Sequence, residues 1–288
     1  MLIHRILSAI VLIPIVLWAV YRGGLLYFAV VSIASLLAAH EFYSMMVQGG
    51  HRPSYPLGMA LTALLLLDAC YPLWQLSRLS LAAALILSLI WQLLQRESRD
   101  DEWSRLGGVH LLQSDSSQYW RDHSSDALVN WALTLAGALY VGWLASHFIS
   151  LRDLPQGMGW TALTLLSTWA CDTGAYSVGM AFGRHPFFPH ISPHKTWEGA
   201  IGGWGSGVAV AALVGYLIGV GVGHGLLLGV VIALAATFGD LAESLLKRQV
   251  GVKDSGRLIP GHGGMLDRID SLLFSVVVVY YYVVVVLV

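Results

Sequence analysis

The sequence predicts an all-α integral membrane protein with about nine transmembrane helices. Hydrophobic residues make up 56% of the 288-residue chain and charged residues only 11%, whereas a soluble domain carries about 25% charged residues. Nine apolar stretches also approach the roughly 20 residues that a helix needs to cross the hydrocarbon core of a bilayer. Together, the low charge and the repeated apolar stretches exclude an ordinary soluble domain.

The nine predicted spans follow one another along the whole chain. They cover residues 6–21, 25–47, 57–73, 79–95, 126–150, 158–182, 199–220, 225–247 and 267–288. The first has a basic start like that of a signal peptide, but no small-residue cleavage site follows it, so we expect it to remain as a helix. The chain divides into a four-helix region at 1–125, with a polar loop at about 96–125, and a five-helix region at 126–288.

The charges in the loops predict which way the helices cross the membrane. With nine spans, only Arg22, Arg78 and Arg152 lie on the side opposite the N-terminus, and the remaining 13 of the 16 Lys and Arg residues lie on its own side. Cytoplasmic loops carry the excess of Lys and Arg. We therefore expect a cytoplasmic N-terminus and an external C-terminus.

Several carboxylates lie inside or at the ends of predicted spans. Asp172 is in the sixth, Asp240 and Glu243 are near the end of the eighth, and Asp267 and Asp270 open the ninth. A charged side chain inside the bilayer is costly, so such residues usually have a partner and a function. In the predicted topology the sixth and eighth spans end on the cytoplasmic side and the ninth begins there. These side chains can therefore meet in a cavity in the cytoplasmic half of the membrane.

Helical spacing supports one shared site. Asp240, Glu243, Ser244 and Lys247 follow the i, i+3, i+4, i+7 pattern of a single helix face. Taken singly, Asp267 and Asp270 could instead stabilise a helix start. Oxygen ligands suit Mg²⁺, which takes one or two carboxylates together with substrate phosphates. We expect Mg²⁺ at Asp240, Asp267, Asp270 and Asp172, and the sequence does not decide between one metal ion and two.

Two polar segments between the last spans are candidates for binding phosphate. In the loop after the sixth span, Ser192, Lys195 and Thr196 precede a helix start, where phosphate often binds; a Pro-rich turn capped by Thr196 is the equal alternative. The segment 244–270 combines flexible glycines and three aspartates with five cations, which are Lys247, Arg248, Lys253, Arg257 and Arg268. His262 lies between glycines and is a further candidate phosphate donor.

Other polar or small residues favour structural roles. His40-Glu41 and Asp68 are isolated in their spans, which is typical of interfacial placement or of a hydrogen bond between helices. Cys70 and Cys171 form no disulfide framework or zinc motif. Small residues recur every fourth position from Gly199 to Gly219, which lets another helix approach closely. This stripe suits either packing within the subunit or the seam of a homodimer.

Two blocks resemble the phosphatidate cytidylyltransferase family, also called CDP-diacylglycerol synthases. Residues 244–270 read S-x-x-K-R-x₄-K-D-x₂-R-x-x-P-G-H-G-G-x-x-D-R-x-D, which is similar to the signature of that family. Residues 172–199, from Asp-Thr-Gly-Ala-Tyr to His-Lys-Thr-Trp-Glu-Gly, resemble a second block. His194 stands where we would expect a second lysine, so Lys195 is the sole fixed charge of that block.

The resemblance implies a reaction in which CTP and phosphatidate give CDP-diacylglycerol and pyrophosphate with Mg²⁺, in the bacterial cytoplasmic (inner) membrane. Its partners would be CTP, phosphatidate and membrane lipids, and not nucleic acid. The catalytic residues would lie in the five-helix region at 126–288. The implied catalytic residues are Asp240, Asp267 and Lys247; the implied phosphate-binding residues are Ser192, Lys195, Ser244, Arg248, Lys253, Arg257, His262 and Arg268; the implied metal ligands are Asp240, Asp267, Asp270 and Asp172.

Two other functions remain open. A CTP-dependent enzyme acting on another lipid, such as an ether lipid or a polyprenol, would use similar residues. A cation-coupled transporter would also have carboxylates within the membrane. Such a protein is expected to show inverted repeats and interrupted helices in both halves of its chain. No internal repeat is evident, and the polar residues crowd into the second part of the chain.

Overall fold

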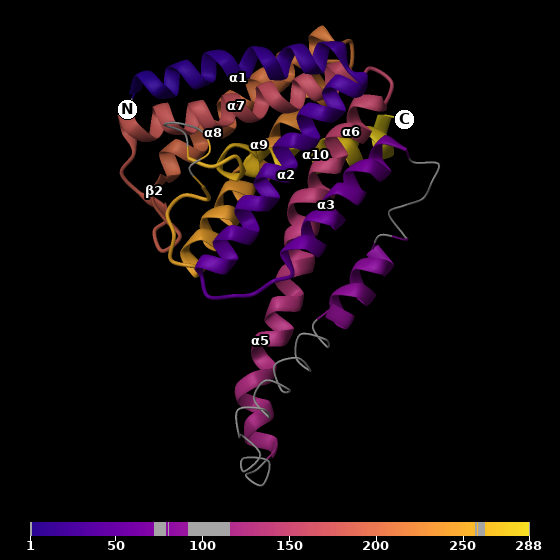
Figure 1. Ribbon diagram of the computed structural model, residues 1–288. Coiled ribbons are helices and arrows are strands. Elements are labelled where there is room, and N and C mark those ends of the chain that lie inside the picture. Colours follow the sequence, from indigo (N-terminus) through magenta and orange to yellow (C-terminus); the bar gives the residue numbers. More distant parts are fainter. Residues whose placement is uncertain are drawn as a thin grey trace.

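The computed structural model describes residues 2–71, 79, 81–91, 116–256, 258 and 263–287, and for residues 2–11 and 116–126 only the helical backbone. In this part of the chain the N-terminal helices are α1 (Leu2–Arg22), α2 (Gly24–Gln48) and α3 (Tyr55–Cys70). A further apolar helix covers Leu81–Trp91. Figure 1 shows α1 along one side of the bundle beside α7, and α5 extending away from the other helices.

The C-terminal part begins with one long, nearly continuous helical segment. It consists of α5 (Ser116–Gly137), the π-helical turn η3 (Ala138–Trp143) and α6 (Leu144–Asp153). The helices that follow are α7 (Gly157–Phe182), α8 (Trp197–Leu217), α9 (Val222–Gln249) and α10 (Leu266–Tyr282), which ends in the π-helical turn η4 (Val283–Leu287).

Each predicted span coincides at least in part with a described helix. Five helical segments of the described chain are long and apolar enough to cross a membrane: Gly24–Gln48, Ala127–Asp153, Trp197–Leu217, Val222–Gln249 and Leu266–Leu287. The helices at Leu12–Arg22, Tyr55–Cys70 and Leu81–Trp91 are apolar but shorter. The membrane character of the fold is thus supported, while the full count of nine spans stays a prediction.

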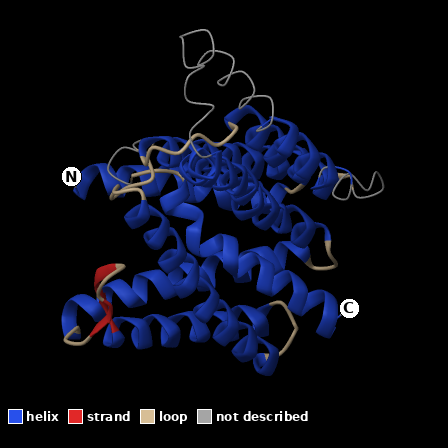
Figure 2. Cartoon of the chain, turned by 90° about the horizontal axis from the view of Figure 1, so that it is seen from below, coloured by secondary structure: helices blue, strands red, loops and turns tan. Residues whose placement is uncertain are grey.

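The all-α fold class is confirmed for the described residues, and the predicted loop between α7 and α8 contains a short hairpin that was not predicted. Strands β1 (Pro186–Phe188) and β2 (Ser192–Thr196) form an antiparallel hairpin between α7 and α8. The segment contains Pro186, Pro189 and Pro193, and proline within a helix removes a backbone donor and clashes with the preceding turn. Figure 2 shows this hairpin in red at the edge of the helices.

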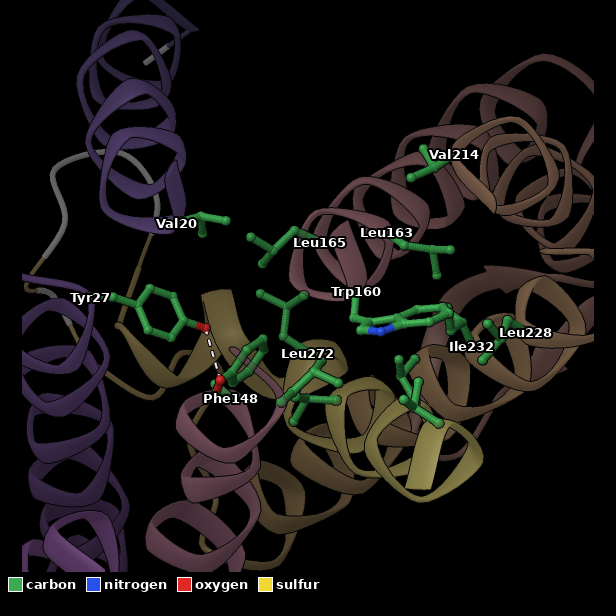
Figure 3. Close-up of a cluster of buried hydrophobic side chains, with 14 of the residues drawn as sticks. Val20, Tyr27, Phe148, Trp160, Leu163, Leu165, Val214, Leu228, Ile232 and Leu272 are labelled. Carbon is green, nitrogen blue, oxygen red and sulfur yellow. Dashed lines mark hydrogen bonds between the residues drawn. The ribbon is translucent and has the colours of Figure 1, made fainter. Parts of the chain in front are cut away.

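The main apolar core joins the C-terminal helices to the first two helices. Trp160 and Leu163 of α7 pack with Ile232 of α9 and with residues of α10. Figure 3 shows this cluster, together with the hydrogen bond that Tyr27 of α2 donates to the carbonyl oxygen of Phe148 (3.2 Å). Core packing therefore holds α7, α9 and α10 together near the segments that carry the predicted site.

Loops that should share one side of the membrane also meet in the fold. Arg152, after the fifth span, donates from Nε to the carbonyl oxygen of Val20 at the end of the first (3.0 Å). The backbone N–H of Arg52, after the second span, donates to Asn130 at the start of the fifth (2.7 Å). Both contacts join chain segments that the nine-span prediction puts on a common side, and the topology itself stays a prediction.

The stripe of small residues packs inside the subunit. A Cβ on Gly203 of α8 would lie 2.7 Å from the carbonyl oxygen of Cys171 on α7, and one on Gly215 would lie 2.9 Å from Cα of Gly225 on α9. The helices therefore approach through backbone contacts that a larger residue would prevent. Because these positions are covered by α7 and α9, the stripe no longer argues for a homodimer, which stays a prediction.

We expect Gly203→Val to destabilise the α7–α8 contact. Overpacking a close contact costs about 1–3 kcal/mol, so the melting temperature of the detergent-purified protein should fall by several degrees. Gly205→Val is the matched control, because Gly205 lies on the same helix with no neighbour within 4 Å of an added Cβ. Equal melting temperatures for the two variants would contradict this packing.

Candidate functional site

The first part of the candidate site joins the hairpin to α9. Lys195 on β2 pairs with Asp240 on α9, with 2.5 Å between Nζ and Oδ2. Ser244, one turn further along α9, donates to the other oxygen of Asp240 at 3.4 Å. Arg248 donates from Nε to the carbonyl oxygen of Ile191 in the hairpin (3.1 Å). The hairpin is thereby held against the last turns of α9 by a lysine and an arginine from opposite partners.

The start of α8 shows Thr196 in the capping role that the sequence offered as one of two interpretations. Its side chain accepts a hydrogen bond from the backbone N–H of Gly199 (3.2 Å), as an N-cap does. Glu198 in the first turn accepts from the backbone N–H groups of Arg184 and His185. Thr196 and Glu198 therefore shape the hairpin, and Lys195 is the residue of this block that reaches the carboxylates.

The second part of the site joins α9 to α10. Lys247 lies between Glu243 on its own helix, 2.5 Å from Nζ to Oε2, and Asp267 on α10, 2.6 Å from Nζ to Oδ1. The side chains of Glu243 and Asp267 are only 1% and 9% exposed. Charges this deeply buried require partners, so Lys247 connects the two helices through their acidic side chains.

Asp267 also organises the segment that precedes α10. Its Oδ2 atom accepts from the backbone N–H groups of Ser255 (3.1 Å) and Gly264 (2.8 Å) and from the hydroxyl of Ser255 (2.9 Å). Gly263 has a φ of +80°, a conformation that favours glycine. The glycines of this motif thus allow the chain to turn around the carboxylate.

Asp270 and Asp172 complete the group of carboxylates. Asp270 is buried, and its Oδ1 accepts from the backbone N–H of Ser271 (2.7 Å). Asp172, exposed on α7, interacts electrostatically with Asp270, Asp240, Lys195 and Arg268. Side chains from α7, β2, α9 and α10 therefore lie near one another, as expected for the carboxylates of spans that share one end.

Not every predicted site residue is part of this cluster. Ser192 begins β2, and Lys253 is exposed in the segment between α9 and α10; no contact of either side chain with the cluster is described. Arg257 and His262 lie outside the described residues, so their predicted phosphate-binding roles are untested. The expected cavity beside Asp240 stays a prediction.

Two contributors were not anticipated. Glu41 on α2 is only 4% exposed and accepts hydrogen bonds from the hydroxyl of Ser255 (3.2 Å) and from the backbone N–H of Leu266 (2.8 Å). Sequence reasoning assigned Glu41 an ordinary helix contact and gave Ser255 no role. A carboxylate inside a membrane helix was the available signal, but its partners lie 214 and 225 residues away in the chain.

The carboxylate oxygens of the cluster are of the type that binds a divalent cation, but they are not already arranged as a metal site. No three His, Cys, Asp or Glu side chains in the described parts of the chain form a group that could hold a metal ion. The cluster nonetheless holds more acids (Asp172, Asp240, Glu243, Asp267 and Asp270) than bases (Lys195, Lys247 and Arg268). The buried Oε1 of Glu243 has no hydrogen-bond partner among these residues. Excess oxygen donors of this kind fit Mg²⁺.

Comparison with known proteins agrees with this chemistry. The chain is 33% identical over 252 residues to a phosphatidate cytidylyltransferase of Mycobacterium bovis, which covers 86% of this chain and 77% of that protein. A Mycobacterium tuberculosis protein of the same name is also 33% identical over 252 residues, covering 86% of this chain and 72% of its own. A Brucella suis protein of the same name is 44% identical over 140 residues, covering 48% and 52% of the two chains.

The match to a family model extends over nearly the whole chain and includes every residue of the cluster. The model described as "Cytidylyltransferase family" matches residues 3–286. This range includes the hairpin, the segment before α10 and all the described helices except the first residue of α1 and the last of η4. The chain therefore belongs to the cytidylyltransferase family.

Proposed function

We propose that this protein transfers the cytidylyl group of CTP to phosphatidate, producing CDP-diacylglycerol and pyrophosphate for phospholipid biosynthesis. The observation that carries the proposal is the meeting of Lys195 and Lys247 with aspartates from three helices, in a chain whose relatives are named phosphatidate cytidylyltransferases. Both reactants are polyanions, and lysines beside metal-binding carboxylates suit such reactants.

The reaction itself needs little from an acid or a base. A phosphate oxygen of phosphatidate attacks the α-phosphorus of CTP, a new P–O bond forms, and the bond to the β-phosphate breaks as pyrophosphate leaves. A phosphate monoester has a second pKa near 6, so the nucleophile is already largely ionised at neutral pH. The protein would contribute by aligning the two phosphates and by stabilising the charge that moves to the leaving group.

The burial of the cluster suggests how its residues divide the work. Asp172 and Arg268 are exposed and Asp240 is partly exposed, whereas Glu243 and Asp270 are buried. Of the accessible members, Lys195 and Arg268 would contact phosphates and Asp172 and Asp240 would hold the metal ion, while the ion pair of Lys247 and Asp267 holds together the helices that present them. Ser244, Arg248, Lys253, Arg257 and His262 are further candidates for phosphate contacts, and Ser192 for a hydroxyl contact.

Mg²⁺ would be held by Asp240, Asp267, Asp270 and Asp172, and when bound it would supply positive charge for the phosphates. Release of Asp240 from Lys195 and of Asp267 from Lys247 would free carboxylate oxygens for this purpose. The lysines would then be available to the substrate phosphates. A second metal ion is compatible with the number of carboxylates.

Incubation of the purified protein with labelled CTP, phosphatidate and Mg²⁺ should yield CDP-diacylglycerol and pyrophosphate. Activity should disappear when the divalent cation is chelated and return when Mg²⁺ is added, because the excess acids of the site need a counter-charge. Parallel reactions with an ether-lipid phosphate and with a polyprenol test the alternative acceptors. A phosphorylated alcohol as the product, in place of a CDP-lipid, would contradict the proposal.

Asp240→Asn and Asp267→Asn should each lower the rate of transfer by about a hundredfold or more, since each removes a charge that organises the phosphates and metal. Rates are measured with saturating CTP and normalised to folded protein. Asp68→Asn is the matched control, because it also replaces a carboxylate of a membrane helix. Near wild-type turnover in both site variants would refute the assignment.

We also propose that the site faces the cytoplasm of a bacterial inner membrane, where CTP is available, while the acyl chains of phosphatidate remain in the bilayer. In a background lacking Cys70 and Cys171, His190→Cys in the hairpin should react with a membrane-impermeant maleimide only after the cells are opened. Val222→Cys, at the start of α9, should react in intact spheroplasts. The reverse pattern would overturn the orientation.

A further inference from the structure

Glu41 is a buried carboxylate that no step of the proposed reaction uses. It lies on α2, in the N-terminal part of the chain, and is 4% exposed. One of its oxygens, Oε2, accepts both the hydrogen bond from the backbone N–H of Leu266 (2.8 Å) and that from the hydroxyl of Ser255 (3.2 Å). Its contacts thus reach Ser255, in the segment that precedes α10, and Leu266, the first residue of α10.

The contact with Leu266 replaces a missing helix cap. The first N–H groups of a helix have no partner within it, and the residue at the N-cap of α10, Met265, makes no capping hydrogen bond through its side chain. The carboxylate of Glu41 accepts from the first residue of α10 instead, where negative charge is favourable to the helix dipole. It therefore determines where α10 begins relative to α2.

The contact with Ser255 connects Glu41 to a site aspartate. The hydroxyl of Ser255 lies within hydrogen-bonding distance of Glu41 Oε2 (3.2 Å) and of Asp267 Oδ2 (2.9 Å), and its oxygen accepts from the backbone N–H of Asp267 (3.3 Å). Ser255 is 4% exposed. Because the other oxygen of Asp267 binds Lys247, Glu41 is one residue removed from the central ion pair.

Two glycines are needed for this approach. A Cβ on Gly256 would collide with Oε1 of Glu41, and a Cβ on Gly264 would collide with Oε2 of Glu41 and with the hydroxyl of Ser255. The backbone on both sides of the polar segment thus closes directly onto the carboxylate. A larger residue at either position would displace either the Glu41 carboxylate or this segment of the backbone.

We infer that Glu41 is a positioning residue, which holds Ser255 and the start of α10 and so fixes the position of the Asp267 carboxylate in the site. It acts through Asp267 and touches no substrate. The inference rests on the proposed function for its consequence in catalysis. The clamp itself is a property of the fold and can be measured without substrate.

The test compares Glu41→Ala, Glu41→Gln and Ser255→Ala with the wild type, and Asp68→Asn serves as the matched control on α3. Glutamine keeps an acceptor oxygen at the same reach, whereas alanine removes it. Amide hydrogen exchange is followed by mass spectrometry in peptides covering 254–256 and 263–270. The kcat, the KM for CTP and the Mg²⁺ concentration for half-maximal rate are measured per folded molecule.

Glu41→Ala should accelerate exchange at the start of α10 and lower kcat by about 10–100-fold, as loss of a residue that orients a metal ligand typically does. It should also raise the Mg²⁺ requirement, while the KM for CTP changes little. Glu41→Gln should restore most of the wild-type exchange and kcat, and Asp68→Asn should change neither. Ser255→Ala should reproduce the loss in part, and it replaces Glu41→Ala in the comparison if that variant does not fold.

Unchanged exchange at 263–270 in Glu41→Ala would overturn the clamp. Faster exchange with wild-type kcat and Mg²⁺ requirement would overturn its role in catalysis, as would an equal loss of kcat in Asp68→Asn. If the wild type itself makes no CDP-lipid, the proposed function fails. The exchange measurements then still decide whether Glu41 holds the start of α10.

Discussion

The contact of Lys247 with Glu243 and Asp267 is the interaction that links the fold to the chemistry. It joins α9 to α10 through a cation that is 13% exposed and acids that are almost fully buried. Removing one partner of such a buried pair typically costs about 3–5 kcal/mol, because the other charge is left uncompensated. The same groups that stabilise the helix pair therefore define where a phosphate or a metal ion can bind, and neither role can change without affecting the other.

This arrangement is built at the ends of helices, where the backbone supplies further polar groups. Asp267 accepts from the backbone of Ser255 and Gly264, and Glu41 accepts from the first N–H of α10. On the other side, Lys195 enters from a hairpin whose position is set by Thr196 and Glu198 at the start of α8. Anionic groups suit helix N-termini, so the carboxylates serve the helices as well as the site.

Much of the fold and of the site was predictable from local patterns. Apolar stretches of sufficient length placed the helices, because a bilayer requires a minimum span. The i, i+3, i+4, i+7 spacing placed Asp240, Glu243, Ser244 and Lys247 on one face. The hairpin at 186–196 was not anticipated, although its three prolines argue against a helix. Its pairing depends on contacts between residues that periodicity does not reveal.

The sequence by itself determined which residues carry charge inside an apolar chain, and which helices present them at a common end. Because burial of charge in a membrane is costly, charged residues within apolar stretches can be recognised from the sequence as candidates for a functional site. Only the tertiary structure decided the partners. It assigned Lys195 to Asp240 and Lys247 to both Glu243 and Asp267, and it brought Glu41 to the start of α10 from 225 residues away. Hydrogen bonds act over about 3 Å, and the packing of α2 against α10 that brings these atoms together leaves no periodic signal in the chain.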